Sequence, residues 1–300
     1  MPSTRVLTVD PLHPEPEILL EAGLALAQGA LVAFPTETVY GLGANALRAH
    51  AVRRIFEAKG RPAADPLIVH VAHRDQLGPL VAFIPPTLAA LERFWPGPLT
   101  VVLRRSDRIP LEVTAGLDSV GIRIPAHPVA LGLLRAAGVP VAAPSANAFT
   151  RPSPTLAAHV LEDLDGRIEL LIDGGPTWHG VESTVVDLTG ERPLLLRPGA
   201  ITVEQLLEAL PGLELPPPIM AGHEAGALRS PGTHLKHYAP RARLRLFVGE
   251  PPDRVRAAIG LEVKAQLAEG RRVGVMLPVE WLEPFASLPV VRVALGTEGD

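Results

Sequence analysis

The amino-acid sequence predicts an α/β protein: a twisted, mixed open sheet with flanking helices, then a long linker and a small β/α domain. Short apolar runs of strand type alternate with helical stripes as far as Leu210. The alternation then gives way to a stretch rich in proline and glycine, after which a second strand and helix series begins. We therefore expect a main domain over residues 1–210, a linker or lid over 211–241, and a small Rossmann-like domain, short enough to be a truncated one, over 242–300.

Proline in the first turn and glycine after the last mark several helices. The first helix is expected over residues 16–28, opened by Pro16 and closed by Gly29. A second is expected over 50–58, where apolar residues form one stripe and Gly60 is a suitable C-terminal cap. Further helices are predicted over 86–94, 129–137, 153–164 (with Ser153 as N-cap and Pro154 as first residue), 203–210 and 253–267.

Strands are predicted where short runs of valine, isoleucine and leucine stand between turn residues. In the main domain these runs cover residues 31–34, 67–71, 99–103, 120–124, 139–143, 170–172, 184–188 and 194–196. In the small domain they cover residues 244–248, 273–277 and 290–293. Strands that alternate with helices are typical of a mixed, twisted sheet.

The composition excludes several classes of protein and site. The chain has no cysteine, which excludes disulfides, thiolate nucleophiles and cysteine-ligated metal sites. A formal net charge of −4 gives no general attraction to nucleic acid, although it does not exclude a local basic groove. No apolar run reaches the roughly 18 to 20 residues of a membrane span, and the N-terminus lacks the layout of a signal peptide. We expect a cytoplasmic protein with no membrane partner.

The common signatures of nucleotide and hydrolase sites are absent. No glycine-rich loop ends in Gly-Lys-Ser/Thr, and Gly41-Leu-Gly43 lacks the third glycine of a dinucleotide fingerprint. No Gly-x-Ser-x-Gly elbow surrounds Ser145. His234 and His237 resemble half of a metal site, but no partner ligands accompany them, so no protein-bound metal is expected.

Three short stretches concentrate polar chemistry beside apolar runs: residues 34–46, Lys59-Gly-Arg61 and Pro144-Ser-Ala-Asn147. Only three lysines occur in the chain, and one of them is Lys59. Hydroxyls, amides, glycines and fixed cations together suit a site that binds a polyanion and a small zwitterion.

Arginine is repeatedly placed beside a proline or glycine turn. Arg61, Arg123 and Arg197 each have this setting, which can present a guanidinium to phosphate or carboxylate oxygens. Neutral partners nearby are Thr36, Thr38, Ser145, Asn147, Ser153, Ser183 and Thr184. Each residue taken alone is more typical of a solvated loop, turn or cap; the set favours anion binding.

Seven motifs, in order between Glu15 and Leu210, resemble those of the threonylcarbamoyl-AMP synthases, a family with a YrdC-like catalytic domain. They are Pro35-Thr-Glu-Thr-Val-Tyr-Gly-Leu-Gly43, Lys59-Gly-Arg-Pro62, Phe94-Trp-Pro-Gly-Pro-Leu-Thr100, Val120-Gly-Ile-Arg-Ile-Pro125, Ala143-Pro-Ser-Ala-Asn147, Glu182-Ser-Thr-Val-Val186 and Leu196-Arg-Pro-Gly199. The later Ser230-Pro-Gly and His237-Tyr-Ala-Pro240 resemble the linker of the two-domain branch.

The resemblance implies roles for individual residues. Positions matching threonine-binding residues are Thr38, His70, Arg123, Ala143 (through its backbone) and Ser183. Positions matching ATP-binding residues are Arg61, Asp65, Ser119, Ser145, Ser153 and Arg197, and Tyr238 of the linker is expected to close over the nucleotide. Lys59, Arg61, Ser145 and Asn147 match the family's catalytic Lys-x-Arg and Ser-x-Asn signature, with Lys59 and Arg61 on phosphates. His70 fits a buried core position equally well.

The resemblance also implies a reaction. L-threonine, bicarbonate and ATP, with Mg²⁺ on the triphosphate, would give threonylcarbamoyl-AMP and pyrophosphate. This product is the donor for N6-threonylcarbamoyladenosine in tRNA, added by a downstream transferase. A weak contact with tRNA is compatible with this role. Alignment and charge neutralisation, without a catalytic carboxylate, would supply most of the catalysis.

Three other functions stay open at this point. One is an RNA-binding or ribosome-associated module, disfavoured by the net acidity and the scarcity of lysine and aromatic residues. Another is a regulator that binds nucleotide without catalysis. The third, a carbamoyl-transfer enzyme of hydrogenase maturation, is disfavoured because the cysteine zinc motifs of that class are absent.

Overall fold

The computed structural model describes residues 3–216, 239–240, 242–249 and 251–297. The chain divides into two compact units, Met1–Arg241 and Ala242–Asp300. Most of the predicted linker, including Tyr238, lies outside the described residues.

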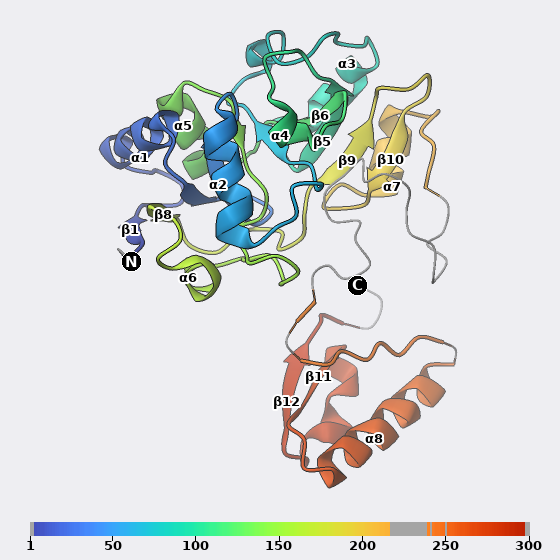
Figure 1. The fold of residues 1–300 in the computed structure, drawn as a ribbon. Coiled ribbons are helices and arrows are strands. Elements are labelled where there is room, and N and C mark those ends of the chain that lie inside the picture. Colours follow the sequence, from blue (N-terminus) through green and yellow to red (C-terminus); the bar gives the residue numbers. More distant parts are fainter. Residues whose placement is uncertain (1–2, 217–238, 241, 250, 298–300) are drawn as a thin grey trace. The chain divides into compact units, whose positions relative to one another are not determined.

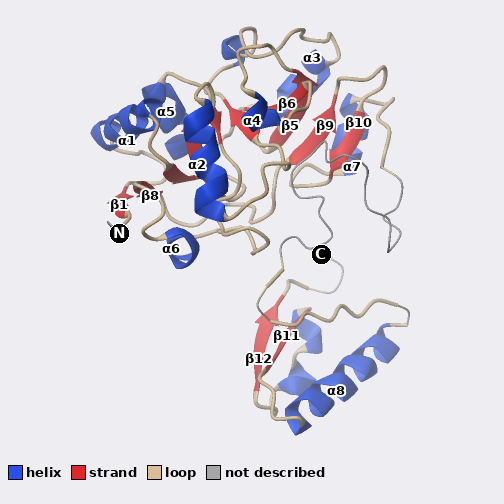
Figure 2. Ribbon diagram, in the orientation of Figure 1, coloured by secondary structure: helices blue, strands red, loops and turns tan. Residues whose placement is uncertain are grey.

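A ten-stranded mixed sheet forms the centre of the first unit (Figures 1 and 2). Its strands are β1 (Arg5–Thr8), β2 (Val32–Pro35), β3 (Tyr40–Asn45), β4 (Ile68–His70), β5 (Leu99–Arg104), β6 (Ser119–Arg123), β7 (Val141–Ala142), β8 (Leu170–Asp173), β9 (Thr184–Asp187) and β10 (Leu194–Arg197). Their order across the sheet is β1-β8-β2-β3-β7-β4-β6-β5-β9-β10. Parallel pairs (β1/β8, β2/β8, β4/β6, β5/β9) occur together with antiparallel ones, which confirms the predicted mixed α/β fold.

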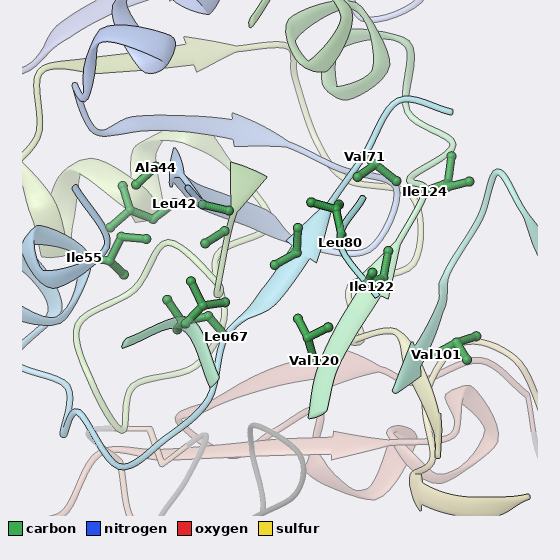
Figure 3. Packing of buried hydrophobic residues seen from close by; sticks show 14 of the residues in the cluster. Leu42, Ala44, Ile55, Leu67, Val71, Leu80, Val101, Val120, Ile122 and Ile124 are labelled. Atoms are coloured by element: carbon green, nitrogen blue, oxygen red, sulfur yellow. The ribbon is translucent and has the colours of Figure 1, made fainter. Parts of the chain in front are cut away.

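Helices cover both faces of this sheet. They are α1 (Pro16–Gln28), α2 (Ala49–Lys59), α3 (Leu88–Leu91), α4 (Leu111–Thr114), α5 (Pro128–Ala137), α6 (Ala157–Leu164) and α7 (Val203–Ala209). Leu31, just before β2, and Ala33 join the larger apolar cluster with α2 and α6, whereas Val32 and Phe34 join the cluster with α1 and α5. Successive strand residues point to opposite faces, so a strand buried on both sides is apolar throughout. Figure 3 shows part of the larger cluster.

Gly23 allows α1 and α5 to approach closely. A Cβ added to Gly23 would lie 2.7 Å from the backbone of Ala136 and Ala137. The two helices lie side by side in Figures 1 and 2, and their facing leucines, Leu19, Leu26 and Leu133, are buried. No side chain larger than hydrogen fits this contact without moving a helix.

Two strands escape prediction, and both have a physical reason. β1 is short and largely exposed, so it carries little apolar signal. β3 contains Gly41 and Gly43, which resemble a turn in the sequence. In the structure a Cβ on Gly43 would lie 2.9 Å from Phe34 Cε1 and 3.0 Å from Val141 Cγ1, so glycine serves close packing here.

Two predicted helices are shorter than expected. The helix predicted over 86–94 is a short α3 followed by a 3₁₀ turn, Glu92–Phe94. The helix predicted from Ser153 begins only at Ala157, so the assignment of Ser153 as an N-cap is wrong. Its hydroxyl instead donates to Glu182, and the carbonyl of Pro154 accepts from Tyr40 N–H of β3. These tertiary hydrogen bonds take the place of local capping.

The second unit, among its described residues, contains α8 (Pro252–Ala268) and two parallel strands, β11 (Val273–Leu277) and β12 (Val290–Ala294). Its core includes Ile259, Val263, Val275, Leu277 and Phe285. The strand predicted over 244–248 is wrong, because the described chain offers it no pairing partner and β11 pairs with β12. Within the described chain, none of the helices has both the length and the apolar character needed to cross a membrane.

We expect Gly23→Ala to destabilise the first unit by about 1–3 kcal/mol, because the added methyl group forces α1 and α5 apart. The urea midpoint of unfolding measures this change. Gly260→Ala is the control: it lies in α8, and its added Cβ meets no atom within 4 Å. That variant should be neutral or slightly stabilising, since alanine favours helix. Equal losses in both would contradict the close-packing argument.

Candidate active site

The central strands bring polar side chains from distant parts of the sequence into one row. β4 and β6 are parallel and in register, which places His70 opposite Arg123, the last residue of β6. Arg123 is also opposite Thr100 of the antiparallel β5, and β5 pairs in turn with β9, which begins at Thr184. A cation, an imidazole and hydroxyls thus meet where the central strands β4 and β6 end and β5 and β9 begin.

A cavity opens over this row. It is lined by Thr36, Thr38, Val39, Gly41, Arg61, Pro66, Leu67, Ile68, His70, Arg123, Ala143, Pro144, Ser145, Glu182, Ser183 and Arg197. All five positions predicted to bind threonine are among them, together with three predicted to bind ATP: Arg61, Ser145 and Arg197. A smaller neighbouring cavity, lined by Ser119, Thr100 and Gly121, shares the segment Pro66–Ile68 with the first.

The remaining predicted residues do not line the main cavity. Ser119 belongs to the smaller one, and Ser153 lies behind Glu182, to which it donates at 2.5 Å. Asp65 is fully buried and forms an ion pair with Arg61 at 2.8 Å. Lys59 and Asn147 are buried behind the turn that carries Ser145. Tyr238 is outside the described residues.

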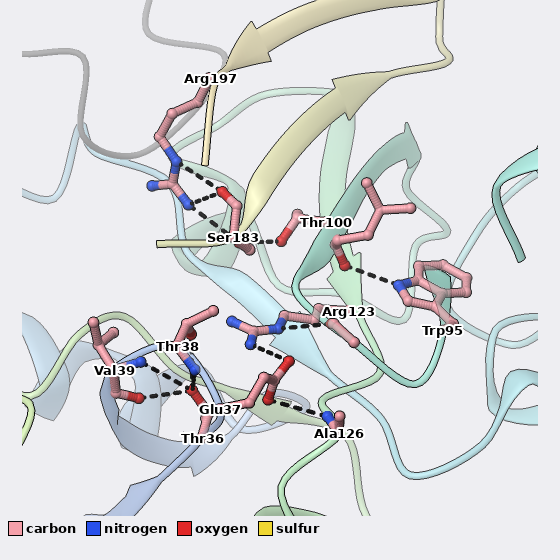
Figure 4. A network of polar contacts seen from close by, with 12 residues as sticks. Thr36, Glu37, Thr38, Val39, Trp95, Thr100, Arg123, Ala126, Ser183 and Arg197 are labelled. Atoms are coloured by element: carbon pink, nitrogen blue, oxygen red, sulfur yellow. Dashed lines mark hydrogen bonds and ion pairs between the residues drawn. The ribbon is translucent and has the colours of Figure 1, made fainter. Parts of the chain in front are cut away.

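Glu37 and Arg123 form a buried ion pair at the side of the cavity (Figure 4). Arg123 Nη2 donates to Glu37 Oε1 at 2.6 Å, and the N–H of Ala126 donates to Glu37 Oε2 at 3.0 Å. Burial alone would raise the pKa of Glu37, but the Arg123 charge and the hydrogen bonds to the carboxylate outweigh it and lower that pKa. Glu37 is therefore an anion that fixes the Arg123 guanidinium against the cavity wall.

The backbone carbonyls of Glu37 and Thr38 bind a second segment of the chain, residues 178–180. The carbonyl of Glu37 accepts from the N–H groups of Trp178 and His179 at 3.1 and 2.9 Å. The carbonyl of Thr38 accepts from Gly180 N–H at 3.0 Å. Thr36 Oγ1 donates to Val39 O and contacts Thr38 Oγ1 at 2.9 Å, which closes the turn and presents the two hydroxyls together.

Arg197 is fixed at the other side of the cavity. Its guanidinium donates to the carbonyl of Ser183 at 2.9 Å and to Ser183 Oγ at 3.2 Å (Figure 4). Ser183 Oγ also contacts Thr100 Oγ1 at 2.8 Å. Gly199 makes this approach possible, because a Cβ there would lie 2.4–2.6 Å from backbone atoms of residues 182–184.

Residues two apart in Lys59-Gly-Arg61 reach different places because Gly60 reverses the chain. Gly60 caps α2 with φ of 63°, a conformation suited to glycine. Arg61 then reaches the cavity, paired with Asp65, while Lys59 stays at the end of α2. Burial, and next the Arg61 charge, lower the pKa of Lys59 well below its usual value.

His70 is a neutral side chain in the cavity wall. Burial, and next the Arg123 charge, lower its pKa to about 3. Its Nδ1 is buried without a hydrogen-bond partner among the described residues. A neutral imidazole with a free ring nitrogen can exchange a hydrogen bond with a ligand, and its pKa is too low for a base near neutral pH.

Comparisons with known proteins indicate the family of this chain. The Sua5/YciO/YrdC family model, described as "Telomere recombination", matches residues 24–199, and a model described as "Threonylcarbamoyl-AMP synthase, C-terminal domain" matches residues 201–298. The threonylcarbamoyl-AMP synthase of Pyrococcus abyssi is 48% identical over 91% of this chain and 80% of its own length. That of Bacillus subtilis is 47% identical over 89% of this chain and 75% of its own length.

The chain belongs to the threonylcarbamoyl-AMP synthase family. This confirms the resemblance read from the seven motifs. Among solved structures, P. abyssi Sua5 complexed with L-threonine has a TM-score of 0.90 at 44% identity, covering 99% of this chain and 85% of that one. Escherichia coli YciO has a TM-score of 0.60 at 22% identity, over 67% of this chain and 98% of that one, which shows a shared fold.

The sequence predicted a role for one carboxylate, Asp65, but none for two others of this threonylcarbamoyl-AMP synthase family member, Glu37 and Glu182. Glu182 lines the cavity, and Glu37 anchors Arg123 from behind. Each lies inside a recognised motif, so its position was visible in the sequence. The ion pair between Glu37 and Arg123 was not visible there, because the two residues are far apart in the chain and meet only in the folded protein.

We expect Glu37→Gln to lower the free energy of unfolding by up to about 3–5 kcal/mol near neutral pH, since it leaves a buried guanidinium without its counterion. The gap from the wild type should shrink as the pH falls below 4.5, the ordinary pKa of the group, because only the wild-type unfolded chain gains that proton there. Urea unfolding between pH 3 and 8 tests both points.

Glu21→Gln is the matched control, because the Arg5–Glu21 ion pair is exposed (59% and 46%) and should contribute at most about 1 kcal/mol. A gap for Glu37→Gln that is independent of pH down to pH 3 would contradict the ionised state assigned to Glu37.

Proposed function

We propose that this chain is a threonylcarbamoyl-AMP synthase, which converts L-threonine, bicarbonate and ATP into threonylcarbamoyl-AMP, pyrophosphate and water. The observation that carries the proposal is the convergence of Arg61, Arg123 and Arg197 with Thr38 and Ser183 on one cavity. An acidic protein thereby gains a local site for an anionic nucleotide and for the carboxylate of threonine. The name of the family's relatives supplies the reaction.

Threonine would occupy the part of the cavity formed by Thr38, His70, Arg123, Ala143 and Ser183. Arg123 is the natural clamp for its carboxylate, since a guanidinium matches a carboxylate fork and Glu37 already fixes its orientation. P. abyssi Sua5, a protein of the same fold, was crystallised as a complex with L-threonine, and that complex supports a threonine site in this fold.

ATP would extend from this point along Arg61, Ser145 and Arg197, with Ser119 in the adjoining smaller cavity. The threonine amine first captures carbon dioxide or bicarbonate as a carbamate. A carbamate oxygen then attacks the α-phosphorus, and pyrophosphate leaves with the broken phosphoanhydride bond. The arginines align the two anions and neutralise charge that develops on the phosphates.

Several finer assignments belong to this proposal. Mg²⁺ would enter with the triphosphate; among the described residues, no group of three or more His, Cys, Asp or Glu side chains could hold a metal. The product would pass to a transferase that modifies tRNA, in the cytoplasm. Tyr238, Asp65 and Ser153 remain predicted nucleotide-binding residues.

Pyrophosphate release, with threonine and bicarbonate each supplied or withheld, tests the proposed reaction. Release that requires both is the expected result. Release with neither would replace the proposal with another adenylating or hydrolytic activity. No release from folded protein that binds ATP would indicate a regulatory nucleotide-binding role.

Arginine variants test the division of the cavity. We expect Arg123→Ala to raise the KM for threonine by one to two decades with a much smaller effect on ATP, and Arg61→Ala to do the reverse. A lost charge-assisted hydrogen bond costs about 1.5–3 kcal/mol, which sets that scale. Steady-state kinetics with one substrate varied at a time measure both constants. Equal effects on both substrates would refute the division.

A further inference from the structure

Lys59 is one of only three lysines in the chain, and it is buried behind the site. Only 3% of the residue is exposed, and it does not line either cavity. Its ammonium donates to the carbonyl oxygens of Ser145 and Asn147, each at 2.5 Å, and lies 3.4 Å from Asn147 Oδ1. Three acceptors match the three N–H donors of one ammonium group.

The acceptors all belong to the turn that carries Ser145 into the cavity. Ser145 lines the cavity, whereas Ala146 and Asn147 on its far side are buried. On one flank Ala146 N–H donates to Tyr40 O of β3 at 2.8 Å. On the other flank Phe149 N–H donates to the carbonyl of Lys59 itself at 2.8 Å, so Lys59 holds the turn with both its backbone and its side chain.

Carbonyl oxygens that converge in a buried turn need donors, because an unpaired buried acceptor costs stability. The Lys59 ammonium is the donor for two of them, and Asn147 Nδ2 satisfies two more, those of Ala148 and Arg151, at 2.8 Å. Without the ammonium the turn must open or rotate to reach water, and the Ser145 hydroxyl would leave its place in the cavity wall.

We propose that Lys59 is a positioning residue for ATP: it fixes the Ser145–Asn147 turn so that Ser145 faces the nucleotide, and it does not contact the phosphates itself. This inference rests on the proposed function, since it takes ATP as the ligand of Ser145. Arg61, two residues away, has the opposite geometry, because it lines the cavity and contacts the ligand space directly.

A double-mutant cycle on nucleotide affinity tests the inference. The probe is α,β-methylene-ATP with Mg²⁺, measured by isothermal titration calorimetry, because this analogue cannot be cleaved at the bond that breaks in the reaction. Ser145→Ala and Lys59→Met should each weaken binding about tenfold. In Lys59→Met/Ser145→Ala the affinity should equal that of Lys59→Met alone, because Ser145 is already displaced.

Arg61→Met provides the matched comparison. Arg61 and Ser145 line the cavity separately, so their losses should multiply in Arg61→Met/Ser145→Ala. Losses that multiply in the Lys59 cycle as well would overturn the inference, because Lys59 would then bind the nucleotide independently of Ser145.

Threonine titration separates a local effect from a damaged fold. None of the five threonine positions lies on the turn, so Lys59→Met should keep wild-type threonine affinity within about threefold. If Lys59→Met does not fold, Asn147→Ala takes its place in the cycle, because it loosens the same turn. The Asn147→Ala/Ser145→Ala variant should then bind the analogue with the affinity of Asn147→Ala alone. A wild-type protein that binds the analogue but releases no pyrophosphate would refute the synthase reaction and leave this cycle readable.

Discussion

A buried carboxylate, Glu37, and a buried guanidinium, Arg123, hold the two halves of the cavity together. The pair joins the turn after β2 to the end of β6, and Glu37 also accepts from Ala126 and, through its carbonyl, from the segment around Trp178. Charges so far from water persist only when each has a counterion and further hydrogen bonds. The same pairing keeps Arg123 in a single orientation toward the cavity, so the cost of burying it is met before any ligand arrives.

Glycine performs the complementary task of letting backbones approach. At Gly199 an added methyl group would collide with the backbone of residues 182–184, and Arg197 could not then reach Ser183. At Gly60 a left-handed turn sends Arg61 into the cavity while Lys59 remains behind it. The cationic part of the site is thus shaped as much by the absence of side chains as by the charges themselves.

Local and global charge differ in this protein. The chain is acidic overall, with a formal net charge of −4, yet three arginines meet in one cavity. Two of them, Arg61 and Arg123, have a buried carboxylate partner, Asp65 and Glu37. These carboxylates lower the repulsion between the neighbouring arginines and fix the orientation of each guanidinium group. An anionic substrate therefore meets hydrogen-bond donors that need little rearrangement.

The α/β class and most helices and strands follow from the sequence alone, because apolar periodicity and cap residues act over a few positions. The motifs that carry the site were recognised in the sequence by their resemblance to those of a known family. Residues that line the cavity, such as Arg61 and Arg197, could be named from those motifs and from their place beside proline or glycine turns. The direction that each side chain faces depends instead on the tertiary structure. Sheet register brings His70 beside Arg123, and Ser153 exchanges a local cap for a bond to Glu182. These outcomes depend on contacts between residues far apart in the chain, which local sequence patterns do not record.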